Sequence, residues 1–391
     1  MPPRKSHKVE IVNYTRTEDS VENTLANIRT GKNVEAKRVK QSELFQNAAN
    51  WNFVKGDLAF QKLYRDYERN SLPMSNYYEH AVAQTKFRSK FYFDGGGSID
   101  KKLLTSDSRN AFEVFDYKRN NYDTFKVSTA SELYYPHTGK VTFPHGSQGI
   151  VTFRQKYKII WRTRSYPKFQ YTDRPLLLVN NQSLVITSNS QHEIIYLLAL
   201  LNSPLTRLIL ERNLRQESEK DFLVPIKAVK QYVRVPVVTG QNRHIKKEVI
   251  DRTEEMLGLE ERTLSDYVDF SGILVQKFED VQVEGDNLVL VHDSQKMELP
   301  IKEQTKLVAD SIAEQLGGQQ SALEKRQVSL HELRNLPIMD YQRQNRLKAY
   351  IDDLVFTLYF GIPLPVLGLK NATAIRKACL TNRHYEYILK G

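Results

Sequence analysis

Residues 151–174 combine positive charge with aromatic rings. This segment holds seven Lys or Arg and six aromatic residues against one acid, Asp173. Cationic side chains neutralise phosphates and release counterions, while aromatic rings offer packing surface or planes on which bases stack. Because Phe153, Tyr157 and Trp161 recur every four residues, packing of these rings in a core under a solvated basic face is the alternative. We predict a nucleic-acid-binding surface, whose candidate residues are Arg154, Lys156, Lys158, Arg162, Arg164, Tyr166, Lys168 and Arg174.

Two polar loops and a second basic segment extend this prediction. Asparagine and glutamine can pair with adenine edges and arginine with guanine, so polar loops beside a basic surface are candidates for reading bases. The same residues would also suit ordinary turns. The candidates in the loops are Asn180, Asn181, Gln182, Gln241, Asn242 and Arg243. Further candidates for phosphate contacts lie in the basic segment 204–247 and are Arg212, Arg215, Lys227 and Lys230.

The sequence lacks most motifs of a reaction centre. The glycines at 95–97 fit neither of the spacings G-x-G-x-x-G and G-x-x-x-x-G-K-[ST] that cradle phosphates. His192 and His331 each precede a glutamate but lack the second histidine of a zinc helix. Glu35 and Lys37 have the spacing of metal-dependent nucleases, in which a carboxylate binds magnesium beside a lysine. A nuclease is therefore the enzyme alternative, and we otherwise predict no catalytic residue, metal ligand or cofactor in this chain.

Composition favours a globular protein that binds nucleic acid. The 391 residues are 40% hydrophobic and 26% charged, with a formal net charge of +11. A strongly basic chain favours nucleic acid over acidic small molecules as the ligand. The single cysteine, Cys379, rules out an internal disulfide framework. No apolar run reaches the roughly 20 residues of a membrane helix, so we expect no membrane association and a cytoplasmic location.

Hydrophobic periodicity predicts an α+β protein. Residues 8–14 and the region of Val34 and Val39 are typical of strands, and Ser20 could cap a helix that ends at Gly31. Within 55–80, the apolar Leu58, Phe60, Leu63 and Tyr64 fit one stripe of a helix that Pro73 should interrupt. Residues 85–190 are β-rich, with short runs such as KVTF, GIVTF, YKIIW and SLVITS between turns.

The second half of the chain is predicted to be mainly helical. Residues 191–215 read as a helix broken by Asn202–Pro204, and another helix should end at Gly258. A hairpin is expected about Gly285–Asn287, followed by helices in 305–318 and 340–361. We therefore predict a small N-terminal α/β segment, 1–54, which buries little surface alone and should pack on something else. A β-rich domain, 55–255, and a helical C-terminal domain with a hairpin, 256–391, would follow.

Four sequence runs resemble one family. They are VNNQSLVITS (179–188), the helix EIIYLLALLNSPL (193–205), IDDLVFTLYFGI (351–362) and the opening KVEIVNYT…VEAKRVKQSEL…NWNF. Together they resemble the C-terminal specificity region of the TaqI-like adenine DNA methyltransferases and related single-chain restriction-modification enzymes. The resemblance covers most of the chain in the expected order. It implies that the β-rich domain, 55–255, is a target-recognition domain and that 1–54 and 256–391 dock on a catalytic partner.

What this chain lacks, compared with that family, defines its expected role. Those enzymes hold the target adenine with an [ND]-P-P-[YF] tetrapeptide and bind S-adenosylmethionine at a glycine-rich loop, whereas the only Pro-Pro here is Pro2-Pro3. The resemblance therefore implies a non-catalytic DNA-specificity subunit. It would bind duplex DNA and position the target adenine for a separate methyltransferase subunit that carries S-adenosylmethionine, with or without a nuclease subunit. A non-catalytic RNA-binding protein is the third alternative.

Overall fold

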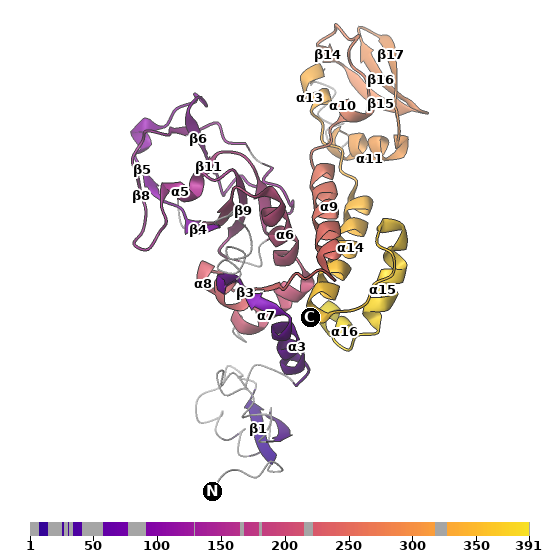
Figure 1. The fold of residues 1–391 in the computed structure, drawn as a ribbon. Coiled ribbons are helices and arrows are strands. Elements are labelled where there is room, and N and C mark those ends of the chain that lie inside the picture. The colour runs from indigo at the N-terminus through magenta and orange to yellow at the C-terminus, as the bar shows by residue number, and fades with distance from the viewer. Residues whose placement is uncertain are drawn as a thin grey trace. The chain divides into compact units, whose positions relative to one another are not determined.

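The structure, a computed structural model, describes residues 8–14, 26, 30, 34–40, 58–76, 91–128, 130–164, 168–179, 182–214, 222–316 and 327–390 (Figure 1). The chain divides into two compact units, 1–67 and 68–391. Helices and several small sheets alternate along it, which confirms the predicted α+β class.

The N-terminal unit contains the two predicted strands. Strand β1 (Lys8–Tyr14) pairs antiparallel with β2 (Val34–Lys40), with Lys8 opposite Lys40 and Tyr14 opposite Val34. Helix α3 (Leu58–Arg69) begins in this unit, as its apolar stripe predicted. Apart from Ala26 and Thr30, the helix expected between Ser20 and Gly31 lies outside the described residues, as does the expected domain boundary after residue 54.

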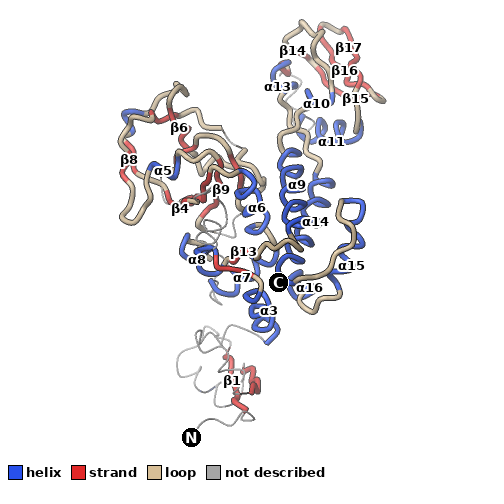
Figure 2. Tube along the Cα trace, viewed as in Figure 1, coloured by secondary structure: helices blue, strands red, loops and turns tan. Residues whose placement is uncertain are grey.

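A four-stranded antiparallel sheet organises the β-rich region of the second unit. Its order is β10 (Gln170–Thr172), β9 (Tyr157–Arg162), β12 (Ser183–Ser188) and β4 (Tyr92–Gly95). Ile160 and Val185 pair across it and join a core cluster with Phe112 and Leu177. Helix α6 (Gln191–Leu201), which Figure 2 shows beside β9, contacts β9, β10 and β12. Because both faces are covered, Lys158–Trp161 are all buried instead of alternating.

Smaller elements surround this sheet. Strand β6 (Ala111–Val114) pairs with β7 (Tyr134–Pro136) and β11 (Leu176–Leu177), β5 (Ser98–Ile99) with β8 (Val141–Thr142), and β3 (Ser71–Pro73) with β13 (Arg234–Pro236). A 3-10 helix, η2, spans Lys101–Leu103.

One run in the β-rich region is helical. The residues GIVTF, which resemble a strand, form the short helix α5 (Ile150–Phe153). The reason lies just before it, where Gly149 turns the chain at φ +72° and its N–H binds the buried carboxylate of Asp94.

The predicted break between two helices is present. Helix α6 ends at Leu201 and α7 (Pro204–Leu214) begins after Asn202 and Ser203. The Ser203 hydroxyl donates to Leu200 O (2.7 Å) and accepts from Thr206 N (3.3 Å), which ends one helix and starts the next. No single helix among the described residues is long and apolar enough to cross a membrane; α6 and α7 have that composition only as a pair, bent by 62°.

Further helices of the second unit pack on α6 and α7 or on one another. They are α8 (Ile226–Tyr232), α9 (Arg243–Leu259), α14 (Tyr341–Phe360), α15 (Ala372–Leu380) and α16 (Tyr385–Lys390), with a 3-10 turn η4 (Leu369–Asn371). Helix α9 includes Gly258, predicted as its end, and the expected boundary after residue 255 falls inside it.

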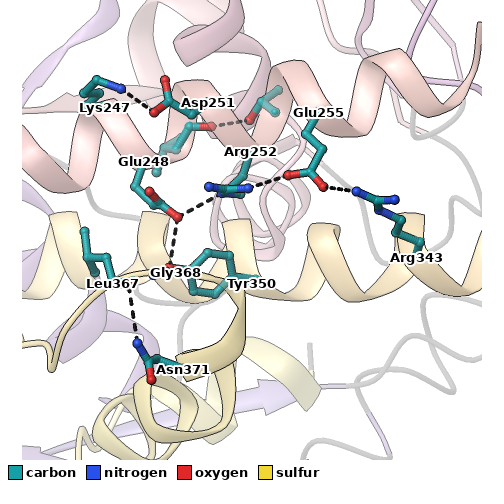
Figure 3. A network of polar contacts seen from close by, with 12 residues as sticks. Lys247, Glu248, Asp251, Arg252, Glu255, Arg343, Tyr350, Leu367, Gly368 and Asn371 are labelled. Carbon is teal, nitrogen blue, oxygen red and sulfur yellow. Dashed lines mark hydrogen bonds and ion pairs between the residues drawn. The ribbon is translucent and has the colours of Figure 1, made fainter.

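A polar network joins α9 to α14 (Figure 3). Arg252 bridges Glu248 (2.9 Å) and Glu255 (2.5 Å) on its own helix, and Arg343 of α14 binds the other oxygen of Glu255 (2.6 Å). Burial raises the pKa of Glu255, but the hydrogen bonds from Arg343 and Arg252 outweigh burial and hold that pKa below its usual value. Glu248 also accepts from the Tyr350 hydroxyl (3.3 Å), so the two helices are fixed in register.

A segment between α9 and α14, residues 264–338, has a core of its own. Its elements are α10 (Leu264–Tyr267), β14 (Lys277–Phe278), β15 (Asp280–Glu284), β16 (Asn287–His292), β17 (Gln295–Pro300), α11 (Thr305–Leu316), β18 (Val328–Ser329) and α13 (Leu330–Arg334). The predicted hairpin is β15–β16, and β17 adds a third strand that the sequence did not predict. The chain enters and leaves at one place, since Ile338 N donates to Arg262 O (3.0 Å).

Candidate nucleic-acid interface

A basic cleft of about 620 Å³ lies where the β-rich region meets α7, α14 and α16. Its described lining includes five cationic side chains and one carboxylate, Asp123. Polar and apolar groups complete it, among them Tyr122, Phe125 and Asn202. The cations of this basic cleft are Arg162, Arg164, Lys168, Arg207 and Lys348. Such an excess of positive charge inside low-dielectric walls favours an anion.

Arg162 and Arg164 come from the end of a central strand. Arg162 is the last residue of β9 and lies opposite Ser183, the first residue of β12. Both arginine side chains are exposed, and neither has an ion pair with the residues that the structure describes. The end of β9 and the bend that follows it therefore present two uncompensated guanidinium groups at the cleft, where each could bind phosphate.

Lys168 is held more firmly. Its ammonium group donates to Asp123 O and lies 4.4 Å from the centre of the Phe125 ring. Burial lowers the pKa of Lys168 below its usual value, and the negative charges of Glu260 and Asp123 offset part of that effect. This geometry fixes one positive charge in the wall of the cleft.

Asn202 fastens the strand side of the cleft to the helix side. Its Oδ1 accepts from Phe169 N (3.0 Å), and its Nδ2 donates to Phe169 O (2.9 Å) and Leu198 O (3.1 Å). The side chain therefore joins the end of α6 to the residue after Lys168. Asn202 was foreseen only as part of a helix break, and its position in the cleft wall was not predicted.

Glu260 supports the same wall from the end of α9. Its carboxylate accepts from Phe125 N (2.9 Å), Lys126 N (2.7 Å) and the Gln344 side chain (2.6 Å). Burial raises the pKa of Glu260, and these hydrogen bonds offset part of that rise. The loop that carries Asp123 and Phe125 is thus tied to α9 and α14.

The cations of the segment 151–174 separate to the two ends of β9. Arg154 and Lys156 precede the strand and are exposed, whereas Arg162 and Arg164 lie at its far end, roughly 17 Å away at about 3.3 Å per residue. Arg174 lies near the first end, where it binds Glu113 (3.2 Å). The segment therefore does not form one continuous basic surface. Of its candidate DNA-binding residues, Arg162, Arg164 and Lys168 line the cleft.

The prediction for Lys158 is wrong. Its side chain is 1% exposed, and its ammonium group donates to Gln155 O (2.7 Å) and Arg174 O (2.9 Å), with Lys156 O at 3.4 Å. Burial lowers the pKa of Lys158 to about 8. The lysine therefore joins backbone segments in the interior, where no phosphate can reach it.

The rings of the segment follow the alternative of core packing. Trp161, Phe169 and Tyr171 are at most 4% exposed, and the Trp161 indole N–H donates to Val224 O (2.9 Å). They stabilise the sheet and offer bases no exposed plane. Tyr166 lies outside the described residues.

The predicted base-reading loops do not come together. Gln182 is exposed and lies at the cleft end of the sheet, because its carbonyl accepts from Thr163 N (3.1 Å); Asn180 and Asn181 are outside the described residues. Asn242 closes the turn before α9 by binding Thr239 N and Val237 O. Asn242, Gln241 and Arg243 lie at the N-terminal end of α9. Glu260 lies at the other end of this helix, roughly 25 Å away.

The remaining candidates lie on helices. The guanidinium group of Arg212 binds the Tyr387 hydroxyl (3.3 Å), Lys227 is exposed on α8, and the ammonium group of Lys230 lies 4.7 Å from the centre of the Phe93 ring. Arg215 is outside the described residues.

Two cations of the cleft were missed from the sequence. Arg207 follows Pro204 by three residues within the basic segment 204–247, which was a weak signal. Lys348 precedes Asp352 by four residues on a helix, a pattern typical of an ordinary surface ion pair. Nothing in the sequence indicates that α14 meets the β-rich region.

Among the described residues, no three His, Cys, Asp or Glu side chains are placed to hold a metal ion together. Glu35 and Lys37 lie on β2, opposite Asn13 and Ile11, and the structure does not describe their side chains.

Comparisons with known proteins give distant likenesses only. The sequence matches no family model and no curated protein. The fold is similar to the type IIG restriction endonuclease BpuSI (TM-score 0.36, 12% identity, 90% of this chain and 40% of that one). It is also similar to the type I restriction-modification S subunit from M. genitalium (0.25, 12%, 77% and 92%) and the HsdS subunit from Thermoanaerobacter tengcongensis (0.25, 13%, 74% and 95%). This chain thus spans 40% of the length of the endonuclease.

Proposed function

We propose that this chain is the DNA sequence-specificity subunit of a restriction-modification or adenine methyltransferase complex. It binds duplex DNA and positions the target adenine for extrusion into a separate subunit that binds S-adenosylmethionine. We also propose that the protein is cytoplasmic, as expected from the sequence.

The observation that carries the proposal is the basic cleft. Its volume lies within the roughly 300–1,000 Å³ of small-ligand sites, so it takes part of one strand's backbone while the duplex lies across its mouth. Phosphate contacts fix register and orientation, which a specificity subunit needs before base contacts can act. Extrusion of a base costs a few kcal/mol, and this cost requires a firm grip on the flanking phosphates.

A paired-variant experiment tests the role of the cleft. In the full chain, Arg162→Ala/Arg164→Ala should weaken duplex binding and lower the slope of log K against log salt by about 1.8, since each phosphate contact contributes about 0.9. Fluorescence anisotropy over a salt series measures both quantities. Arg154→Ala/Lys156→Ala is the matched control, because it removes two exposed cations from the other end of β9. Equal losses in both pairs would contradict a localised phosphate site.

Methyl transfer tests the role of a subunit. Methylation of duplex DNA should require mixing this chain with the co-encoded methyltransferase, and the chain alone should transfer no methyl group. Magnesium-dependent cleavage abolished by Glu35→Ala would instead establish the nuclease alternative. A preference for single-stranded RNA over duplex DNA would favour the RNA-binding alternative.

A further inference from the structure

We propose that Lys348 is a DNA phosphate contact whose charge Asp352 neutralises, so that Asp352 sets how tightly the basic cleft binds DNA. This inference rests on the function proposed above. It identifies a carboxylate outside the cleft wall as a determinant of affinity.

The geometry of the pair carries the argument. Lys348 lines the cleft, and its ammonium group lies 2.5 Å and 2.6 Å from the two carboxylate oxygens of Asp352, one helical turn further along α14. The two side chains are only 21% and 17% exposed. Asp352 lines a small neighbouring cavity, which shares Ser203, Pro204 and the end of α16 with the cleft. The ion pair therefore connects the two cavities.

The adjacent carboxylate cannot take over this role. Asp353 accepts from the Tyr385 hydroxyl and from Arg376 (3.1 Å), so its charge is already balanced by α15 and α16. Asp352 is therefore the group that compensates Lys348. A phosphate entering the cleft must compete with this carboxylate for the ammonium group.

Protonation of Asp352 would release the lysine. Burial raises the pKa of Asp352 to about 6, with a further increase from Asp353, while Lys348 and Arg376 lower it. These three charged groups lie on α14 and α15, and Tyr385 of α16 lines the same small cavity as Asp352. Because the pKa is raised, the carboxylate loses its charge as the pH falls through about 6. Below that pH, Lys348 faces the cleft uncompensated.

The test is Asp352→Asn in the full chain, with binding to duplex DNA measured by anisotropy at pH 7.5. The substitution keeps the shape of the side chain and removes its charge. Affinity at 0.1 M salt should rise by about three- to eightfold, and the salt slope should steepen by about 0.9, the contribution of one phosphate contact. Lys348→Met/Asp352→Asn should return both values to about those of the wild type.

A matched control separates this effect from a general change in charge. Asp251 forms the same i,i+4 pair with Lys247 (2.5 Å) on α9 (Figure 3), and neither residue lines the cleft. Asp251→Asn therefore removes the same negative charge but should alter affinity by less than twofold. As the pH falls from 7.5 to 5.5, the DNA affinity of the wild type should approach that of Asp352→Asn. A Lys348→Met chain should lack the part of this gain that comes from protonation of Asp352. Histidine protonation affects all variants alike.

Two results would overturn the inference. One is an Asp352→Asn chain, folded by its melting curve, that binds no more tightly than Asp251→Asn. The other is a gain that persists without Lys348. If Asp352→Asn does not fold, the pH comparison replaces it: an equal gain in DNA affinity between pH 7.5 and 5.5 for the wild type and Lys348→Met would also overturn the inference. Failure of the function itself is distinct, since the wild type would then bind no duplex DNA, or Arg162→Ala/Arg164→Ala would leave its binding unchanged.

Discussion

At the scale of the residue, burial decides what a lysine can do. The sequence around Lys158 is rich in cations and aromatic residues, as in a DNA-binding segment, but Lys158 is buried in a sheet that is covered on both faces. Burial lowers the pKa of Lys158 to about 8 in the folded protein, whereas the usual value in an unfolded chain is 10.5. Between these two pH values the folded protein has lost the proton of Lys158 and the unfolded chain still holds it. The contribution of Lys158 to stability therefore rises with pH between about 8 and 10.

We expect that trend to disappear in Lys158→Met. Relative to this variant, the free energy of unfolding of the wild type should increase by about 1.4 kcal/mol per pH unit between pH 8 and 10. Urea denaturation at several pH values measures the difference. Parallel pH curves for the two proteins would contradict a buried, titrating lysine. The salt slope of DNA binding should be unchanged, since Lys158 touches no phosphate.

Residue types predicted the presence of a basic surface better than the individual residues that form it. The density of cations in 151–174 indicated a polyanion, and three of those cations do line the basic cleft. Which of these cations reach the cleft depends on where β9 begins and ends and on which faces of the sheet other elements cover. Those features follow from pairing with β12 and packing of α6, neither of which a local pattern encodes.

At the scale of the element, the junction of α6 and α7 shapes the cleft. Asn202→Ala would remove three hydrogen bonds and leave the Phe169 amide without its partner. We expect a loss of about 1–3 kcal/mol in the free energy of unfolding and weaker DNA binding, because the segment carrying Lys168 is no longer fixed. Denaturation and anisotropy measure the two effects.

Asn213→Ala is the control for the junction. Asn213 lies on α7 and makes one side-chain hydrogen bond in its helix, to Ile209 O (2.7 Å). This variant should lose less stability and keep its DNA affinity. A similar loss of affinity in both variants would show that Asn202 acts through general stability and not through the cleft.

Elements with strong local signals were predicted well. The break at Asn202–Pro204, the helix α14 and the hairpin β15–β16 follow from proline, hydrophobic periodicity and turn residues. Strand β17 and helix α5 were missed because they depend on partners, a neighbouring strand in one case and the Asp94 carboxylate in the other.

At the scale of the whole molecule, charge is unevenly distributed along the chain. Residues 264–338 hold 13 Asp or Glu and seven Lys or Arg, whereas the whole chain holds 46 and 57. This acidic segment has its own core, built from residues such as Leu288, Ile312 and Leu333. Duplex DNA would repel it, so we expect the proposed phosphate contacts to lie in the rest of the chain.

Removal of the acidic segment tests this division. Thr263 and Pro337 form an isolated β-bridge, so a short Gly-Ser linker could join them in place of 264–336. Because the core of the segment lies within it, we expect the rest of the second unit to stay folded and the salt slope of DNA binding to be unchanged. Loss of repulsion should leave the affinity equal or higher. A lower salt slope in a protein that still melts cooperatively would place phosphate contacts on the acidic segment and contradict this division.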